Sequence, residues 1–538
     1  MHRSRAPADV APSEAVKAQA ALVDVLRNPA LYEGVKQVTV LETHISYVLL
    51  TGRYAYKIKK AVDLGFLDYS TLDARRFYCE EELRLNRRLA PDVYLDVLAV
   101  TGSGRSPAFG GDGQAIEYAV KMREFEQDAL LSRMLEHGTL ASRHIDALAK
   151  RIAEFHGAID IASGDGPFGL PDEIRRLALD NFRELRELVD DTSDRTHLEA
   201  LCEWTEREHA ARADELETRR QDGFVRECHG DLHLNNIALV DGRITVFDCI
   251  EFNDQMRWSD VMSEIAFVAM DLEDRKRRHL AFRFLNAYLE RMGDYAGLGV
   301  LRFFLAYRAM VRAKVAWFRA TQSDPNDQKD AALAEYRGYV SLARKYAQRP
   351  RAAIVLMHGL AGSGKTTESQ RLLESVGAIR IRTDIERKRL HALSPQAHSH
   401  ATIEGGMYSP AETDLTYGHV CALARRVVTA GYVTIVDAAF LKRRQRDQFR
   451  DLASTLSIPF LIVSLSASPD TLRDRLSRRS RSGTDVSEAD TRVLDYQQRT
   501  QERLAPDELP NVVAFEAEPT VNSAASAALC RTVGARLA

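Results

Sequence analysis

The second half of the sequence contains a loop suited to binding phosphate. Residues 359–366 read Gly-Leu-Ala-Gly-Ser-Gly-Lys-Thr and match the pattern G-x-x-x-x-G-K-[ST] in full. The loop follows an apolar run that predicts a buried strand, and it precedes a predicted helix whose N-terminus adds partial positive charge. In such loops the lysine reaches the β- and γ-phosphates, and the hydroxyl residue holds Mg²⁺. The sequence therefore predicts an ATP·Mg²⁺ site formed by Gly359, Gly362, Ser363, Gly364, Lys365, Thr366 and Thr367.

Four charged residues beyond this loop are candidates for chemistry on the phosphate. Asp384 comes directly after one apolar run, and Asp437 ends the next, at the edge of a parallel sheet where ligands bind. Asp384 could instead cap a helix beginning at Ile385. Arg475 and Arg479 lie at helical spacing, and they form either a solvated basic face or a lid over the transferring phosphoryl group.

The first half of the sequence contains a second set of candidate residues. Asp231 follows a His-Gly pair and precedes Asn236 by five positions, the spacing of the kinase catalytic loop H-R-D-x-x-x-x-N. In that loop the aspartate accepts the proton of the acceptor hydroxyl, and the asparagine holds Mg²⁺. A predicted hairpin then carries Asp248 and Glu251. Either acid could be the second metal ligand, and we favour Asp248.

A lysine and a glutamate upstream complete this second set. Lys57 ends the run Tyr-Ala-Tyr-Lys, which is similar to the strand V-A-I-K and predicts contact with the α- and β-phosphates. Residues 80–82 are three glutamates on a predicted helix, and one of them, taken here as Glu82, would pair with Lys57. Each residue alone has a structural explanation, but their order along the chain argues against chance assembly. The Gly-rich loop that covers the phosphates in kinases is missing, and residues 51–53 form only a minimal turn.

With these motifs, residues 36–345 resemble the aminoglycoside phosphotransferase family, which includes choline and homoserine kinases. The resemblance implies a protein-kinase-like fold of two lobes. It also implies that Asp231 is the catalytic base, that Asn236 and Asp248 hold Mg²⁺, and that Asp260 anchors the catalytic loop.

Residues 350–538 resemble the small-molecule kinase branch of P-loop proteins, which includes gluconate kinase, chloramphenicol phosphotransferase and zeta toxin. The resemblance implies that Asp384 deprotonates the acceptor hydroxyl and that Arg387 binds acceptor or phosphate. It makes Arg475 and Arg479 lid arginines, and it gives Asp437 a role in holding Mg²⁺ through water. Together the two halves look like the bacterial proteins known as bifunctional aminoglycoside phosphotransferase/ATP-binding proteins.

The elements that must position these residues differ between the halves. Strands around Gly-containing turns, one helix and then a long helical stretch predict an α+β kinase-like domain, whereas apolar runs alternating with helices predict an α/β P-loop domain with a parallel sheet. Residues 1 to about 30 are Ala-rich and polar and are predicted to pack loosely, and residues 102–113 are predicted to form a turn. The predicted organisation is an N-terminal tail and helix at 1–35, a kinase-like domain at 36–346, a linker at 347–352 and a P-loop domain at 353–538.

Composition limits the remaining possibilities. The 538 residues carry a formal net charge of -3, which gives no sign of generic nucleic-acid binding, and no apolar run approaches the length of a membrane span. Six scattered cysteines predict reduced thiols in a cytoplasmic protein. The predicted activity is transfer of the γ-phosphoryl group of ATP to a hydroxyl of a small molecule or nucleotide. The alternative is an ATP-binding regulatory protein in which one half is a non-catalytic pseudokinase.

Overall fold

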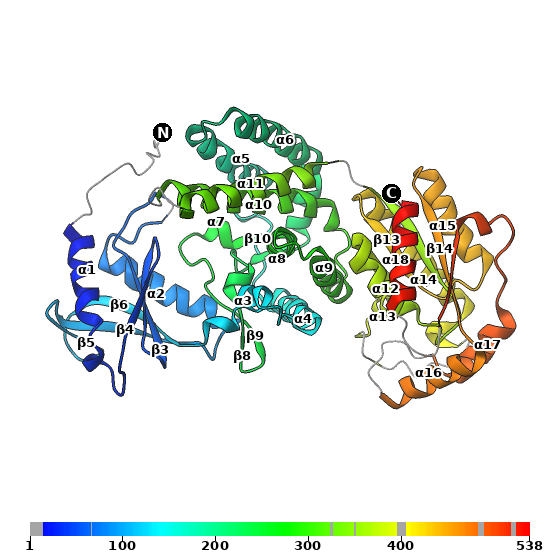
Figure 1. Ribbon diagram of the computed structural model, residues 1–538, viewed down its shortest axis with the longest axis horizontal. Coiled ribbons are helices and arrows are strands. Elements are labelled where there is room, and N and C mark those ends of the chain that lie inside the picture. The colour runs from blue at the N-terminus through cyan, green and yellow to red at the C-terminus, as the bar shows by residue number, and fades with distance from the viewer. Residues whose placement is uncertain are drawn as a thin grey trace. The chain divides into compact units, whose positions relative to one another are not determined.

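The computed structural model describes residues 14–65, 67–322, 327–348, 351–394, 397, 405–482, 489–517 and 523–537. Residues 1–13 of the predicted tail and residues 349–350 of the predicted linker lie outside these ranges. The chain forms two compact units (Figure 1). The first comprises Met1–His144, Glu154–Glu173 and Arg219–Val268, and the second comprises Ile145–Ala153, Ile174–Thr218 and Ala269–Ala538.

The first unit contains an antiparallel sheet of six strands in the order β1-β2-β3-β6-β4-β5. Helix α2 (Leu72–Asn86) packs against β6 and β4, and the side chain of Thr71 caps its N-terminus. Strand β5 lies within the stretch 102–113, so the prediction of a simple turn there is wrong: Ser106–Phe109 pairs with the end of β4. The strands are β1 (Thr39–Glu42), β2 (Ser46–Leu50), β3 (Tyr54–Lys59), β4 (Tyr94–Ser103), β5 (Ser106–Phe109) and β6 (Ala115–Arg123).

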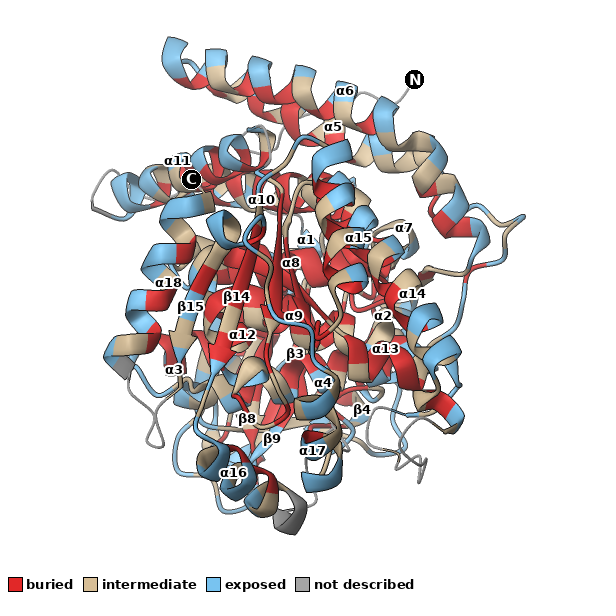
Figure 2. Cartoon of the chain, turned by 90° about the vertical axis from the view of Figure 1, so that its right-hand side faces the viewer, coloured by how far each residue is buried: buried red, intermediate tan, exposed pale blue. Residues whose placement is uncertain are grey.

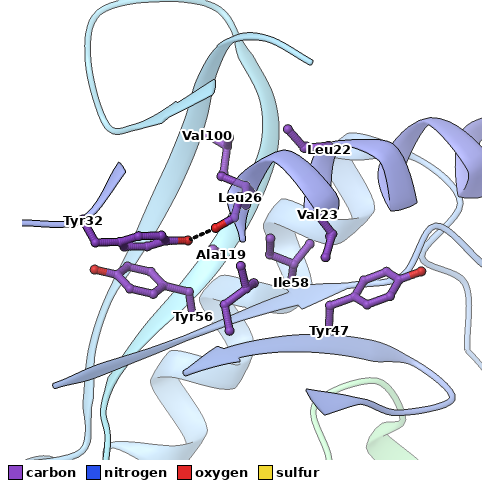
Figure 3. Close-up of a cluster of buried hydrophobic side chains, with 10 residues drawn as sticks. Leu22, Val23, Leu26, Tyr32, Tyr47, Tyr56, Ile58, Val100 and Ala119 are labelled. Carbon is purple, nitrogen blue, oxygen red and sulfur yellow. Dashed lines mark hydrogen bonds between the residues drawn. The ribbon is translucent and has the colours of Figure 1, made fainter. Parts of the chain in front are cut away.

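Helix α1 (Glu14–Leu26) packs on this sheet, contrary to the prediction of loose packing. Its apolar side chains enter a buried cluster with residues of the strands, and the hydroxyl of Tyr32 donates to the carbonyl of Leu26 at 2.8 Å (Figure 3). The buried amide of Gln19 donates to the carbonyl of Lys59 and to the carboxylate of Glu117, both at 2.7 Å. The polar residues of α1 misled the prediction because Gln19 is buried and bonded to the sheet.

A hairpin and a central helix position the second set of candidate residues. Strand β7 (Val225–Glu227) pairs with β10 (Trp258–Asp260), and between them a loop leads into the hairpin of β8 (Ile237–Val240) and β9 (Arg243–Val246). Helix α8 (Val261–Asp274) begins directly after β10. The other helices of this part of the chain are α3 (Leu131–Glu136), α4 (Ser142–Ala158) and α7 (Asp254–Arg257).

The second unit begins with long helices and ends with a parallel sheet. Helices α10 (Leu298–Gln322) and α11 (Asp327–Ala347) pack on each other along their length. The remaining long helices are α5 (Pro171–Leu188), α6 (Thr192–Gln221), which begins in this unit and ends in the first, and α9 (Arg278–Met292). Among the described residues, no helix is both long enough and apolar enough to cross a membrane.

The parallel sheet has five strands in the order β12-β13-β11-β14-β15. Helices α12 and α18 cover one face and α14 and α15 cover the other, so that the inner strands are buried, the edge strand β15 is partly exposed and the outer helix faces are exposed (Figure 2). The predicted fold classes of both halves are confirmed, although the sequence indicated four strands and the fifth, β15, was missed. The strands are β11 (Ala353–His358), β12 (Ala378–Arg382), β13 (Val433–Asp437), β14 (Phe460–Ser466) and β15 (Val512–Glu516); the helices are α12 (Lys365–Leu372), α13 (Thr383–Leu390), α14 (Pro410–Thr429), α15 (Arg443–Thr455), α16 (Pro469–Ser482), α17 (Thr491–Thr500) and α18 (Ser523–Leu537).

Candidate active sites

Lys57 joins α2 to the segment that follows strand β9. Its ammonium group donates to Glu82 at 2.8 Å and to Asp248 at 2.6 Å. Glu82 is the glutamate of the three that faces Lys57, since Glu80 pairs with the exposed Arg76 and Glu81 with Arg84. Burial by itself would lower the pKa of Lys57, but Asp248 and Glu82 outweigh it and raise that pKa well above its usual value.

Lys59, two residues further along β3, shares the carboxylate of Glu82 with Lys57. It is fully buried, donates to the second oxygen of Glu82 at 2.6 Å and pairs with Glu251. Tyr69 also donates to Glu251. Burial would raise the pKa of Glu82, but Lys57 and Lys59 hold it at about 2.

The predicted hairpin ends at Val246, so Asp248 and Glu251 lie in the segment after it, and these contacts distinguish the two acids. Glu251 is buried and occupied by Lys59 and Tyr69. The side chain of Asp248 is 47% exposed, and its backbone has a φ of 63°, which turns the residue out of the regular extended chain. Asp248 therefore has the geometry of a ligand and Glu251 that of a structural anion.

The loop between β7 and β8 brings Asp231 and Asn236 together. The amide nitrogen of Asn236 donates to a carboxylate oxygen and to the backbone carbonyl of Asp231, both at 3.0 Å. That orientation leaves the Asn236 amide oxygen as the atom to offer a metal. His233 lies 3.4 Å from the Asp231 carboxylate. The predicted spacing of five thus corresponds to direct contact between the two side chains.

Glu264 on α8 holds the start of this loop, and the expectation that Asp260 does so is wrong. One oxygen of Glu264 accepts the backbone N–H groups of His229 and Gly230, both at 2.7 Å. Its other oxygen is bonded to the buried ring of His156 at 2.8 Å. Asp260 instead forms a buried, two-pronged ion pair with Arg219, at 2.7 and 2.8 Å, because it precedes α8 and faces α6.

The strands before Lys57 are joined by two short turns, and the predicted turn at 51–53 is present. Strands β1 and β2 are joined by residues 43–45, which contain no glycine. The hydroxyl of Thr43 accepts the backbone N–H of Ser46 at 2.9 Å. The turn at 51–53 joins β2 to β3, and the N–H groups of Thr51 and Gly52 are taken up by Glu124, at 2.9 and 2.8 Å.

The donor set of this first site suits Mg²⁺. Asp248 and Asn236 offer hard oxygen ligands of the kind that Mg²⁺ prefers. The lysines Lys57 and Lys59 contribute two positive charges, and Glu82, Glu251 and Asp248 contribute three negative ones, so the group carries a net charge of -1. A cation is therefore favoured there.

In the second unit, the loop from β11 to α12 has the backbone that a phosphate requires. Gly359, Gly362 and Gly364 have φ values of 145°, 82° and 93°. A Cβ at Gly359 would lie 2.5 Å from the carbonyl oxygen of Leu465, so only glycine fits. Ser363 is buried and its hydroxyl has no hydrogen-bond partner among the described residues, which fits a loop shaped around a polar ligand.

Lys365 is surrounded by the charges that the sequence selected. Its ammonium donates to the carbonyls of Gly359 and Leu360, at 2.8 and 2.9 Å. Burial lowers the pKa of Lys365 to about 8; Asp437 and Asp384 act against this shift, and Arg479 adds to it. Asp384, Asp437 and Arg479, which the sequence predicts as base, metal ligand and lid arginine, therefore all influence the pKa of Lys365.

Thr366 and Asp437 offer oxygen atoms at the edge of the sheet. Thr366 is exposed in the first turn of α12, next to the exposed Thr367. Asp437 ends β13 beside Met357 of β11, is buried, and accepts a hydrogen bond from Ser369 at 3.2 Å. These oxygens also fit a hard cation such as Mg²⁺.

Asp384 is not a helix cap. Helix α13 begins at Thr383, its N-cap residue is Arg382, and Asp384 lies within the first helical turn. The hydroxyl of Thr383 donates to the carbonyl of Asp437 at 3.1 Å, which fixes the start of α13 beside β13. The alternative that Asp384 caps a helix starting at Ile385 is therefore wrong.

The three predicted arginines have different surroundings. Arg475 on α16 donates to the carbonyl of Gly362 in the phosphate loop at 3.4 Å, and Arg479 donates to the carbonyl of Ala489. Arg387 is buried, donates to the carbonyl of Met407 at 2.6 Å and stacks on the ring of Tyr408. Arg475 therefore reaches the phosphate loop itself, whereas Arg387 holds a neighbouring segment.

Comparisons with known proteins agree with this two-part reading. Residues 75–304 match the Phosphotransferase enzyme family, and residues 354–504 match a family described as AAA domain. Uncharacterized proteins of Mycobacterium bovis and Mycobacterium tuberculosis are 30% identical over 450 residues, covering 84% of this chain and 88% of theirs. The chain belongs to the family that joins a phosphotransferase domain to a P-loop ATP-binding domain. The activity common to these domains is ATP-dependent phosphotransfer.

Solved structures match each half separately. A choline/ethanolamine kinase family protein from Mesorhizobium loti has 13% identity and a TM-score of 0.37, covering 61% of this chain and 99% of its own. A gluconokinase from Sinorhizobium meliloti has 21% identity and a TM-score of 0.24, covering 35% of this chain and 93% of its own.

Two residues of the first site, Glu264 and Lys59, were not predicted from the sequence. Glu264 is the only charged residue in the run 261–270, whose other residues are apolar apart from Ser263, and a charge in such a run indicates a buried, bonded carboxylate. Lys59 stands two positions after Lys57, on the same face of a strand, and that alternation would have indicated a second buried lysine.

Proposed function

We propose that both halves of this protein are ATP·Mg²⁺-dependent phosphotransferases and that each transfers the γ-phosphoryl group to a hydroxyl. The observation that carries the proposal for the first half is the pairing of Lys57 with Glu82 and Asp248 beside the bonded pair Asp231–Asn236. For the second half it is the loop 359–366, whose glycines have positive φ values and which leads into α12 at Lys365, together with Asp437, which is bonded to Ser369 of the same helix.

In the first half, Asp231 accepts the proton of the acceptor hydroxyl. The hydroxyl oxygen then forms a bond to the γ-phosphorus, and the bond from that phosphorus to the β-bridging oxygen breaks, releasing ADP. Lys57 binds the α- and β-phosphates, and Glu82 holds its ammonium in place. Phosphoryl transfer needs little covalent chemistry from the protein, so positioning and charge suffice.

In the second half, Asp384 takes the corresponding role of proton acceptor. Lys365 binds the β- and γ-phosphates, and Arg475 and Arg479 lie on the helix that would cover the transferred group. Arg387 supports this arrangement by holding residues 407–408. Bound Mg²⁺ would neutralise phosphate charge in each half, with Asn236 and Asp248 as its ligands in the first and Thr366 and Asp437 in the second.

The acceptor we propose is a small molecule or nucleotide that carries a free hydroxyl group. None of the six cysteines, all of which lie in the described part of the chain, forms a disulfide. This supports a reducing compartment such as the cytoplasm.

The experiment that tests the proposal uses the full chain with labelled ATP and a library of hydroxyl metabolites and nucleosides. Asp231→Asn and Asp384→Asn should each reduce the transfer made by their own half by about 10²–10⁴-fold, with nucleotide affinity retained. Lys365→Ala should remove nucleotide binding to the P-loop. Full turnover in either aspartate variant would refute the base assigned to that half.

A second candidate is an ATP-binding regulator whose first half does not transfer phosphate. The observation that favours it is the β1–β2 turn, which has no glycine and whose Thr43 hydroxyl already binds the N–H of Ser46. Such a turn offers fewer backbone N–H groups to align a γ-phosphate. Mg²⁺-dependent ATP binding without any transfer, and without an effect of Asp231→Asn, would select this candidate.

A further inference from the structure

The outer edge of the parallel sheet is closed by side chains from helix α9 and the segment after it. Strand β12 is the edge strand. The Asn286 amide donates to the carbonyl of Ala378 at 2.9 Å and accepts the N–H of Arg380 at 2.6 Å, as a neighbouring strand would. Tyr295 donates to the carbonyl of Arg380. Both α9 and β12 belong to the second compact unit.

Glu290 on α9 contacts two arginines of the edge strand β12. Glu290 accepts two hydrogen bonds from the guanidinium of Arg380, at 2.9 and 2.7 Å. Its second oxygen lies 3.9 Å from Arg382. Arg380 is buried, and the side chain of Glu290 is only 13% exposed, so solvent screens this pair weakly.

Arg380 connects Glu290 to the predicted Mg²⁺ ligands. The third nitrogen of its guanidinium donates to the carbonyl of Thr366 at 3.3 Å and to the hydroxyl of Ser369 at 3.1 Å. Ser369 in turn donates to the carboxylate of Asp437 at 3.2 Å. Arg382 lies 4.0 Å from the same carboxylate.

We propose that Glu290 is a positioning residue for the Mg²⁺ side of the P-loop site, an inference that rests on the proposed ATP·Mg²⁺ function of that half. The two acids and the two arginines of this buried group, Glu290 and Asp437 against Arg380 and Arg382, balance to zero charge. Glu290 neutralises and orients Arg380, so that Asp437 and Thr366 keep their oxygens for the cation.

The sign of the charge separates this role from a purely structural one. Glu290→Gln leaves the group at +1, and it should raise the Mg²⁺ concentration for half-maximal ATP binding on the order of tenfold. Arg380→Gln leaves the group at -1 and should lower that concentration. A merely structural contact would impair Mg²⁺ binding in both variants.

The experiment measures ATP binding to the full chain over a Mg²⁺ titration. The binding that remains in Lys365→Ala is subtracted, so that only binding to the P-loop is counted. Glu374→Gln is the matched control. Glu374 pairs with Arg283 of α9 at 2.7 Å and has no contact with Arg380 among those given for the described residues, so its variant should titrate as the wild type does.

Opposite shifts in Glu290→Gln and Arg380→Gln would support the proposal. Shifts in the same direction, no shift in either, or an equal shift in Glu374→Gln would overturn it. If Glu290→Gln does not fold, Arg380→Gln decides alone: a lower Mg²⁺ requirement supports the proposal, and an unchanged or higher one overturns it. If Lys365→Ala removes no binding, the proposed function of the P-loop half fails first, and this inference falls with it.

Discussion

The ammonium group of Lys59 is bonded to the carboxylate of Glu251, and both side chains are buried. The same ammonium shares Glu82 with Lys57, so each oxygen of Glu82 receives one lysine. Strand β3, helix α2 and the segment after Asp248 are thereby held together by charge. Lys57 contacts the side chain of the exposed Asp248, whereas Lys59 fixes the frame behind it.

Lys59→Met should destabilise the first unit by about 3–5 kcal/mol, because it leaves the buried carboxylate of Glu251 without its cation. Hydrogen exchange of the β3 amides in a urea series measures this loss. Arg76→Ala is the control, since the Arg76–Glu80 pair is exposed and should contribute about 1 kcal/mol or less. Equal exchange rates in the Lys59 variant and the wild type would show that the buried pair contributes nothing.

Glu82 should make the first unit sensitive to acid. Its pKa is about 2 in the folded chain, against an ordinary value of 4.5. Because the folded value is the lower one, the stabilisation is complete above about pH 4.5 and is lost as the pH falls toward 2, on the order of 3 kcal/mol in total. Acid titration of the unfolding free energy should show this loss, and Glu82→Gln should remove it. An acid profile that is the same in Glu82→Gln and the wild type would contradict the prediction.

Glu264→Ala should lower phosphoryl transfer by the first half about 10²-fold with little change in the KM for ATP, because the N–H groups of His229 and Gly230 lose their acceptor and the loop shifts. Asp260→Asn should act differently. It breaks the buried pair with Arg219 and should cost stability, about 3–5 kcal/mol, while the folded fraction retains its turnover. Kinetics and thermal unfolding of both variants test this, and loss of turnover only in the Asp260 variant would reverse the assignment.

Nucleotide binding by the P-loop should weaken as the pH rises through about 8. Burial lowers the pKa of Lys365 to about 8, so above that pH the uncomplexed lysine loses the charge that phosphate requires. ATP would restore the proton, and binding above pH 8 should therefore take up protons. Calorimetry in buffers of different ionisation enthalpy measures the uptake. No uptake at pH 9 would show that Lys365 is already protonated there.

Gly359→Ala should abolish nucleotide binding and destabilise the P-loop domain, because the new Cβ would lie 2.5 Å from the carbonyl oxygen of Leu465. Gly418→Ala is a control in which stability should rise instead of fall. Gly418 lies within α14, and no atom of the described residues lies within 4 Å of its Cβ position, so alanine should stabilise that helix by about 0.5–1 kcal/mol. Thermal unfolding should show a lower stability for Gly359→Ala and a higher one for Gly418→Ala. ATP titration should show the loss of nucleotide binding in Gly359→Ala.

The sequence predicted those contacts and positions that depend on spacing along one loop or one strand. Asp231 and Asn236 are five apart and touch, and the residues 359–366 follow their strand as the pattern requires. Both fold classes followed from the alternation of strands and helices. These patterns lie within short stretches of the chain, so a single sequence is enough to find them.

The partners that come from distant elements could not be found in this way. Glu264 reaches the catalytic loop from another helix, and the choice of Asp260 failed because only the tertiary structure shows that it faces Arg219. The burial of α1 depends on a long-range bond of Gln19 to the carbonyl of Lys59, and its polar composition pointed the other way. Glu290 lies 90 positions from Arg380, and no pattern links them.

The closure of β12 by Asn286 bears on how such a protein can evolve. An open strand edge invites pairing with other chains. A gene split between the helical segment and the P-loop would remove Asn286 and Tyr295 from the product and expose that edge, so the separated fragment would tend to aggregate. Selection would then retain the fusion on grounds of solubility alone, whatever the activity of each half.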